Sequence, residues 1–175
     1  MLIDGGFPRQ DKLYEEAIAL HKSAIERLVR AYEANPDKQG DLLQDVHLAL
    51  WQSFQNYEER CSLRTWVYRV AHNTAASHVV REQRVNLRTW VGLEALDAEP
   101  AGTLHGVPER KLDLDRLMEL VHQLNPFARQ IMLLYLEGLD AESIGDVTGL
   151  STGNVRVQMH RIRTILSRQF HGEDK

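Results

Sequence analysis

Cysteine is almost absent from this sequence, which has a single one, Cys61, among 175 residues. One cysteine excludes an internal disulfide, and no Cys-x-x-Cys pair or Cys/His cluster predicts a structural zinc site. No apolar run approaches the roughly 20 residues of a membrane-spanning helix, and the first residues show no basic segment followed by an apolar one. We therefore expect a cytoplasmic protein without membrane insertion, metal site or cofactor.

The period-two alternation of a half-buried strand is missing as well. Apolar residues instead recur every three or four positions, which predicts helices over residues 12–34, 40–54 and 62–84. Proline in the Asn35-Pro36 pair separates the first two. The predicted core residues of these helices are Leu13, Ala17, Leu20, Ala24, Leu28, Ala31, Leu42, Val46, Ala49, Leu50, Leu63, Val67, Val70, Ala71, Ala75 and Val79.

Charge is segregated along the chain, although the formal net charge is only −4. Residues 60–88 contain six arginines and one acid, and residues 151–171 contain four arginines and no acid. The acids outnumber the bases ten to five over residues 11–59 and eleven to four over residues 94–146. Two basic tracts between acidic ones suggest two places that can meet phosphate, although a charge run can also be a solvated face.

Helical periodicity stops after the third predicted helix. Residues 94–108 are rich in Pro, Gly, Ala and acids, which predicts a linker between two helical units. Helicity resumes near residue 109 and reaches a cap signal at Asn125-Pro126, where Asn can cap and Pro suits the first helical position. Gly138 suits the end of that helix.

A short helix and a longer one are expected at the C-terminus. The short one covers residues 140–148, with Ile144 and Val147 inward; after the turn at Gly149, Ser151 caps the last helix. The core side of the last helix is predicted to consist of Val155, Met159, Ile162 and Leu166. A short helix, a turn with glycine and a helix with a polar outer side form the helix-turn-helix layout.

The outer side of the last helix has the chemistry of a DNA reader. It carries Asn154, Arg156, Gln158, Arg161 and Arg163. Arginine matches the acceptors that guanine shows in the major groove, and the amides match adenine. Two packed helices with a solvated basic rim are the alternative interpretation.

The combination of motifs resembles the extracytoplasmic-function (ECF) sigma factors of bacterial RNA polymerase. LNPFARQIMLLYLEGLDAESIGDVTGLSTGNVRVQMHRIRTIL resembles their region 4, DLLQDVHLALWQSF their region 2.2, and CSLRTWVYRVAHNTAASHVVREQR their regions 2.3 and 2.4. The resemblance implies an all-α protein of two small domains. These are a region 2 helical bundle at residues 10–90 and a region 4 helix-turn-helix at 109–171, joined by a flexible linker at 91–108.

The resemblance also implies three sets of binding residues. The residues implied to dock on the β′ coiled coil of core polymerase are Asp41, Leu42, Gln44, Asp45, Leu48 and Trp51. The residues implied to bind the minus-ten element are Arg60, Ser62, Arg64, Trp66, Arg69, His72, Asn73, Arg81 and Arg84, with Tyr68 nearby. Residues 55–62 are the loop implied to receive a flipped base. The residues implied to bind the minus-35 element are Ser151, Thr152, Asn154, Arg156, Gln158, His160, Arg161 and Arg163.

The expected function is therefore that of an alternative sigma factor, which directs core polymerase to specific promoters and initiates transcription without being an enzyme. The expected partners are core polymerase (β′ at region 2, β at region 4), promoter DNA and an anti-sigma factor. The sequence departs from the family pattern at four places: His47, Ser77, Ser143-Ile144-Gly145 and Leu124-Asn125. Two alternatives remain: a two-domain helix-turn-helix regulator, and a sigma-like decoy that opens no promoter.

Overall fold

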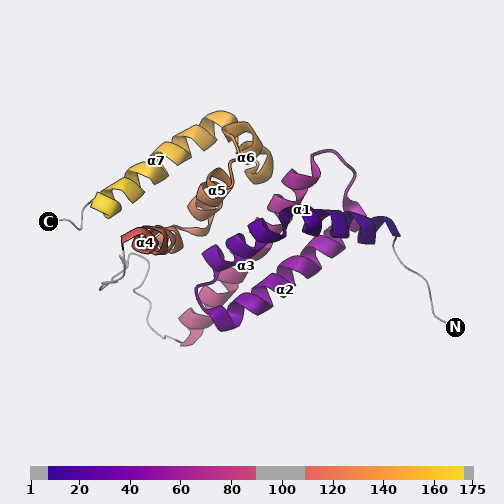
Figure 1. The fold of residues 1–175 in the computed structure, drawn as a ribbon, viewed down its shortest axis with the longest axis horizontal. Helices are drawn as coiled ribbons and strands as arrows, with labels where there is room; N and C mark the ends of the chain where they lie inside the picture. Colours follow the sequence, from indigo (N-terminus) through magenta and orange to yellow (C-terminus); the bar gives the residue numbers. More distant parts are fainter. Residues whose placement is uncertain (1–7, 90–108, 172–175) are drawn as a thin grey trace.

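The structure, a computed structural model, describes the backbone of residues 8–89 and 109–171 and the side chains of residues 9–82 and 116–168. The described part contains helices and no strand (Figure 1). The helices are α1 (Pro8–Tyr32), α2 (Pro36–Ser53), the 3₁₀ turn η1 (Phe54–Asn56), α3 (Leu63–Thr89), α4 (Glu109–Gln123), α5 (Pro126–Leu136), α6 (Ala141–Thr148) and α7 (Thr152–His171). The predicted linker at 91–108 and the side chain of Arg84 lie outside the described residues.

The first three helices pack against one another as an N-terminal bundle. The Asn35 side chain caps the start of α2, because its Oδ1 accepts a hydrogen bond from the Asp37 N–H at 3.0 Å. The predicted core is largely confirmed. Its fully buried members are Ala17, Ala24, Leu28, Ala31, Leu42, Val46, Leu50, Val67, Ala71 and Ala75, while Leu13, Leu63, Val70 and Val79 pack against the core half-buried.

The predicted core position of Leu20 is wrong, because 67% of its surface is exposed. The buried side of α1 is instead completed by Ile25, Val29 and Tyr32, which neighbour the predicted positions. This rotation has a physical cause: α1 packs on α2 and α3 and, at its far end, on α4. A helix covered from several directions buries a wider and shifted face than a single apolar stripe indicates.

The C-terminal caps confirm the predicted boundaries. Asn125 Oδ1 accepts from the Ala128 N–H at 2.9 Å, and Asp140 Oδ1 accepts from the Ser143 N–H at 2.8 Å. Gly138 and Gly149 both have φ of 78°, the left-handed conformation that glycine adopts without strain. Ser151 caps α7, since its Oγ accepts from the Asn154 N–H at 3.3 Å.

A tight approach holds α6 beside the turn that leads into α7. A Cβ added to Gly145 would lie 2.6 Å from the backbone oxygen of Leu150, closer than van der Waals contact permits. Glycine at position 145 therefore allows a closer approach of α6 to this turn than a residue with a Cβ would.

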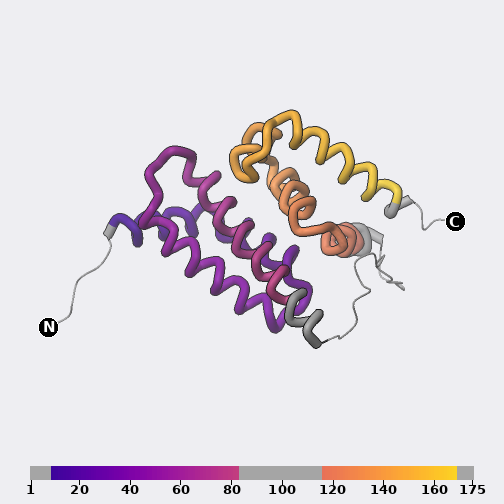
Figure 2. The backbone as a smooth tube through the Cα atoms, turned by 180° about the vertical axis from the view of Figure 1, so that it is seen from behind, coloured from indigo at the N-terminus to yellow at the C-terminus, as the bar shows by residue number. Residues whose placement is uncertain are grey.

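The two halves of the chain lie against each other. In both views α5 and α6 lie beside α3, and α4 lies beside the end of α1 (Figures 1 and 2). Buried residues of both halves belong to one continuous core. The sequence did not predict how the two halves are arranged, and in the structure they pack against each other.

Candidate nucleic-acid interface

Helix α7 presents a buried stripe and an exposed basic side, as predicted. Val155, Met159, Ile162 and Leu166 are buried, which fixes the helix against α5 and α6. The opposite side carries the predicted residues. Ser151, Asn154, Arg156, His160, Arg161 and Arg163 are exposed, and Thr152 and Gln158 are half-buried.

The described part of α7 has no acidic side chain, so nothing on it neutralises these bases from within. The Arg163 guanidinium lies 4.5 Å from the centre of the Tyr135 ring, a cation–π contact that holds it beside α5. Arg156, His160 and Arg163 line one side of a groove between α7 and the α5–α6 turn. The arrangement suits an anionic ligand along α7.

Helix α3 and the loop before it carry the second basic surface. Arg60, Ser62, Arg64, Asn73 and Arg81 are exposed, and Arg69 is half-buried. Ser62 Oγ accepts from the Thr65 N–H at 3.1 Å and so caps the start of the helix. The loop is held from inside, because the Tyr57 hydroxyl donates to the backbone oxygen of Cys61 at 2.7 Å.

Trp66 contributes partly to the core. Its indole Nε1 donates to Ser53 Oγ at 3.0 Å, and its ring centre lies 5.2 Å from that of Tyr57. The side chain is half-buried. It therefore links the end of α2 to the loop that precedes α3.

His72 does not lie at the DNA-facing surface as predicted. Its side chain is 1% exposed, and its Nδ1 is 3.1 Å from the Tyr32 hydroxyl. Burial lowers its pKa from 6.5 to about 3, so the ring is neutral. The helical pattern missed this, because a polar residue on a mostly polar turn gave no sign of a buried partner on α1.

Helix α2 carries the residues expected to contact core polymerase, with one correction. Asp41, Gln44 and Leu48 are exposed, and Asp45 and Trp51 are half-buried. Leu42 is completely buried, so its predicted role at a binding surface is wrong. Trp51 is oriented by α1, because its Nε1 donates to Asp11 Oδ1 at 2.8 Å.

The structure brings members of two predicted sets together in a groove between α2 and α3. Asp45 and Leu48 line it from α2, and Asn73 and Arg81 line it from α3. Arg81 Nη2 lies 3.4 Å from Asp45 Oδ2. Both side chains are largely solvated, so this pair contributes little stability and can separate.

The described residues contain no group of three or more His, Cys, Asp or Glu arranged to hold a metal ion. Within the same ranges, no helix has the length and apolarity to cross a membrane.

Comparison with known families decides the identity. Residues 17–85 match Sigma-70 region 2, and residues 114–166 match Sigma-70, region 4. The chain belongs to the sigma-70 family. Several of its relatives are ECF RNA polymerase sigma factors, and the chain is an ECF sigma factor, a member of a family of non-catalytic transcription initiation factors. Region 2 and region 4 below denote these two matched parts.

Two relatives illustrate the likeness. The chain is 27% identical over 155 residues to the ECF RNA polymerase sigma factor SigE of Mycolicibacterium smegmatis, which covers 86% of the chain and 58% of that relative. It is 24% identical over 167 residues to the ECF RNA polymerase sigma-E factor of Haemophilus influenzae, covering 91% and 88%. The chain thus spans little more than half of the first relative and most of the second.

Two of the solved structures that share the fold illustrate the likeness. One is CnrH in complex with the cytosolic domain of CnrY, with a TM-score of 0.65, 19% identity and coverage of 93% of this chain and 89% of that one. The other is the sigma factor RpoE with the anti-sigma factor NepR from Bartonella quintana, with a TM-score of 0.67, 18% identity and coverage of 93% and 98%.

The sigma factor's N-terminal half overturns the first alternative interpretation. A two-domain response regulator would carry an α/β receiver or a ligand domain there, whereas α1, α2 and α3 form a helical bundle that matches region 2.

Sequence reasoning missed the residues that join region 2 to region 4. They are Arg27 and Tyr32 on α1, and Arg129 and Glu137 at the two ends of α5, and they meet across 94 to 110 positions of sequence. In the sequence, Arg27 and Glu137 appear only as a base and an acid without an oppositely charged residue one helical turn away. That pattern does not identify a contact between residues so far apart in the chain.

Proposed function

We propose that this sigma factor binds core RNA polymerase and directs it to promoters through two DNA contacts, one duplex and one single-stranded. The observation that carries the proposal is the acid-free outer side of α7, opposite a fully buried stripe, in a chain with a second basic surface on α3. Two modest contacts on one assembly reinforce each other through effective concentration, and core polymerase sets their spacing. Acting with polymerase, the chain works in the cytoplasm.

Region 4 reads the minus-35 element in the major groove with α7. Asn154 and Arg156, near the start of the helix, are the candidates for base edges, while Arg161 and Arg163 suit phosphates further along. Ser151, Thr152, Gln158 and His160 complete this surface. Helix N-termini favour anions, which supports phosphate contact at Ser151 and Thr152.

Val157 is a further candidate that the sequence reasoning overlooked. It is 49% exposed, and at 100° per residue it points almost directly away from the buried Val155. An exposed valine between Arg156 and Gln158 suits apolar contact with a thymine methyl group. Gly153, one turn earlier on the same side, leaves room for the close approach of DNA.

Region 2 captures the minus-ten strand. Arg60, Arg64, Arg69 and Arg81 supply cations for the backbone, and Ser62, Trp66 and Asn73 supply hydroxyl, planar and amide groups for an unstacked base. The loop of residues 55–62 receives that base.

Docking on core polymerase uses the outer side of α2. Asp41, Gln44 and Asp45 offer oxygen acceptors to a basic surface, and Leu48, 52% exposed, offers an apolar contact. Region 4 meets the β subunit in the same assembly. Because both structural neighbours were solved with a bound protein, one of them an anti-sigma factor, we also propose an anti-sigma partner for this chain.

Run-off transcription with purified core polymerase and a promoter library tests the proposal. We expect transcripts from a subset of promoters that share two elements, and only when the chain is present. If the chain binds core polymerase but no promoter opens, the proposal fails and the sigma-like decoy is favoured. Arg156→Ala should change which promoters are selected, whereas Arg168→Ala should weaken all of them alike.

A further inference from the structure

The loop that precedes α3 contains a strained backbone. Glu59 has a φ of 60°, and among the residues that the structure describes it is the only one other than glycine with a positive value. A residue with a Cβ adopts this left-handed conformation at a cost in free energy, so surrounding contacts must hold it there. Glu59 is exposed and lies in the loop of residues 55–62, to which the reception of an unstacked base is assigned above.

The first turn of α1 binds this loop. Arg9 Nη2 donates to Glu59 Oε1 at 3.0 Å and to the backbone oxygen of Tyr57 at 3.4 Å. One guanidinium therefore holds the main chain before the strained residue and the side chain of that residue. A rotation of the Glu59 backbone to negative φ would carry its carboxylate away from Arg9, so this contact favours the strained conformation.

The next two residues of α1 bind the end of α2, from which the loop leaves. Gln10 Nε2 donates to the backbone oxygen of Trp51 at 2.6 Å, and Gln10 Oε1 accepts from Gln55 Nε2 at 3.4 Å. The last carbonyls of a helix lack partners within it, and the Gln10 side chain supplies one from a position that is 3% exposed. Asp11 orients the Trp51 indole, as described above.

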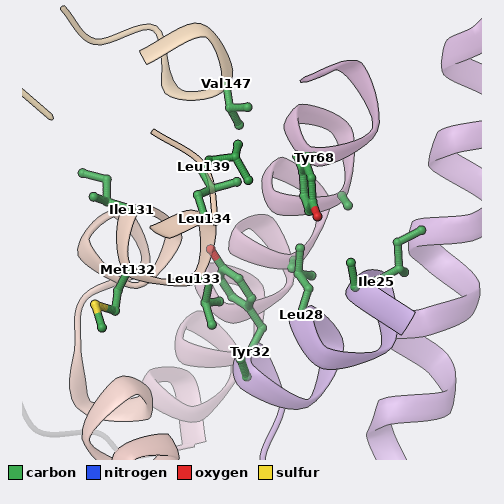
Figure 3. Close-up of a cluster of buried hydrophobic side chains, with 14 of the residues drawn as sticks. Ile25, Leu28, Tyr32, Tyr68, Ile131, Met132, Leu133, Leu134, Leu139 and Val147 are labelled. Carbon is green, nitrogen blue, oxygen red and sulfur yellow. The ribbon is translucent and has the colours of Figure 1, made fainter. Parts of the chain in front are cut away.

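The far end of α1 is anchored in the core, which fixes where its first turn lies. Figure 3 shows Ile25, Leu28 and Tyr32 of α1 in a buried cluster with Tyr68 of α3. In Figure 1 the start of the same helix lies beside the end of α2 and the loop that follows. The sequence did not predict these contacts, because the first helix was expected to begin at residue 12 and α1 begins one turn earlier.

We propose that Arg9, Gln10 and Asp11, together the clamp, are positioning residues for capture of the minus-ten base. They hold the end of α2 and residues 55–59 in the receiving conformation before DNA arrives, so less conformational entropy is lost when the base enters. The clamp also ties this loop to the helix assigned to core polymerase. The proposal rests on the function proposed above, which assigns the loop to the base.

The single cysteine reports the state of the loop in the free chain. Cys61 is half-buried at the end of the loop, so a loosened loop exposes its thiol to an aromatic disulfide reagent. We expect Arg9→Ala to raise the rate of modification roughly two- to fivefold, the range for loss of one exposed ion pair. Lys12→Ala removes the same charge from a nearby exposed position of α1 and should leave the rate unchanged.

Base capture is measured with the polymerase holoenzyme and a promoter from the run-off library that carries 2-aminopurine in its minus-ten element. Arg9→Ala should weaken binding of the single-stranded minus-ten element by a similar factor, roughly two- to fivefold, and lower the unstacking signal. Binding to core polymerase and to the minus-35 duplex should stay unchanged. A purely structural role would lower all of these together.

Two substitutions at position 59 separate backbone strain from charge. Both Glu59→Asn and Glu59→Gln remove the carboxylate, but only asparagine tolerates the left-handed conformation well. Adding Glu59→Asn to Arg9→Ala should therefore restore capture of the base. Adding Glu59→Gln should not.

The proposal is overturned if Arg9→Ala leaves the thiol rate unchanged, or if the rate rises without any loss of capture. Equal rescue by Glu59→Gln would also overturn it, because Arg9 would then act only by neutralising a charge. Failure of the proposed function has a different signature: the unaltered chain gives no transcript in the run-off assay, while the thiol rates still show whether the clamp holds the loop.

Discussion

The two DNA-facing surfaces of this sigma factor contain the same residue type in opposite states. On α7, Arg156 and Arg161 are exposed, and the cation–π contact of Arg163 stays within region 4. On α3, Arg64 and Arg69 are bonded to backbone oxygens of the other half. The α3 surface therefore takes part in the contact between the two halves, although most of its members remain exposed.

This difference matches what each contact requires. Duplex reading needs no opening of DNA, so an exposed helix is sufficient. Capture of an unstacked base follows strand separation, which polymerase assists, and it needs cations along the backbone together with groups that hold the base. Four predictions can break or sharpen the contrast.

The largest expected effect concerns His72, which is buried on α3 beside Tyr32. Because burial holds its pKa at about 3, below the 6.5 of an exposed histidine, the unfolded chain binds a proton that the folded chain does not. The free energy of unfolding should therefore fall as pH drops below 6.5, by about 1.4 kcal/mol per pH unit from this group. Urea denaturation between pH 7.5 and 4.5 measures it.

His72→Gln keeps an acceptor for the Tyr32 hydroxyl but does not titrate. Its unfolding free energy should depend less steeply on pH than that of the unaltered chain. Equal slopes would show that His72 is protonated in the folded chain.

The next effect concerns the exposed side of α7. Arg156→Ala should reduce binding to a minus-35 duplex by about 1–3 kcal/mol if Arg156 pairs with guanine, and preference at that position should relax. Titration of duplex variants by the polymerase holoenzyme measures it. Arg168→Ala, by contrast, should weaken every duplex equally and lower the salt dependence. Identical, sequence-independent losses in both variants would remove Arg156 from base reading.

Gly145→Ala tests how closely α6 packs against the turn before α7. The new Cβ would meet the Leu150 backbone oxygen at 2.6 Å, so the turn before α7 must shift. We expect a loss of about 1–2 kcal/mol of stability in thermal or urea unfolding, in the range of other overpacked sites. Gly153→Ala, where a Cβ meets nothing within 4 Å, should be neutral or slightly stabilising. A stable Gly145→Ala chain would mean that the turn relaxes freely.

The smallest effect concerns Val157. Replacing thymine by uracil, one position at a time, should weaken binding at one minus-35 position by about 0.8 kcal/mol, the value of one buried methyl-sized group. In Val157→Ala that sensitivity should shrink while the other positions respond as before. Unchanged sensitivity would assign the methyl contact to another side chain.

Local signals predicted most of the fold. Asn125, Asp140, Gly149 and Ser151 act on backbone groups within four residues, so the sequence alone located the helix ends. The apolar spacing of α7 was also sufficient, because that helix is covered from one side.

Longer-range packing explains the errors. Leu20 was misassigned because helix α1 buries a face set by several neighbours, and His72 because its partner is Tyr32 on another helix. The spacing placed Leu42 in the core correctly, and only the docking role implied by the resemblance was wrong. The contact between Arg27 and Glu137 joins residues 110 positions apart, and no local pattern encodes it. The residue types of the candidate site were therefore predicted, but its contacts with the other half of the chain were not.

Promoter opening tests the central claim most directly. A promoter selected from the library carries 2-aminopurine in its minus-ten element, and its fluorescence reports unstacking of that base. We predict that fluorescence rises when core polymerase and the chain are both present, and not with either alone. No rise, despite demonstrated binding of the chain to core polymerase, would contradict the account.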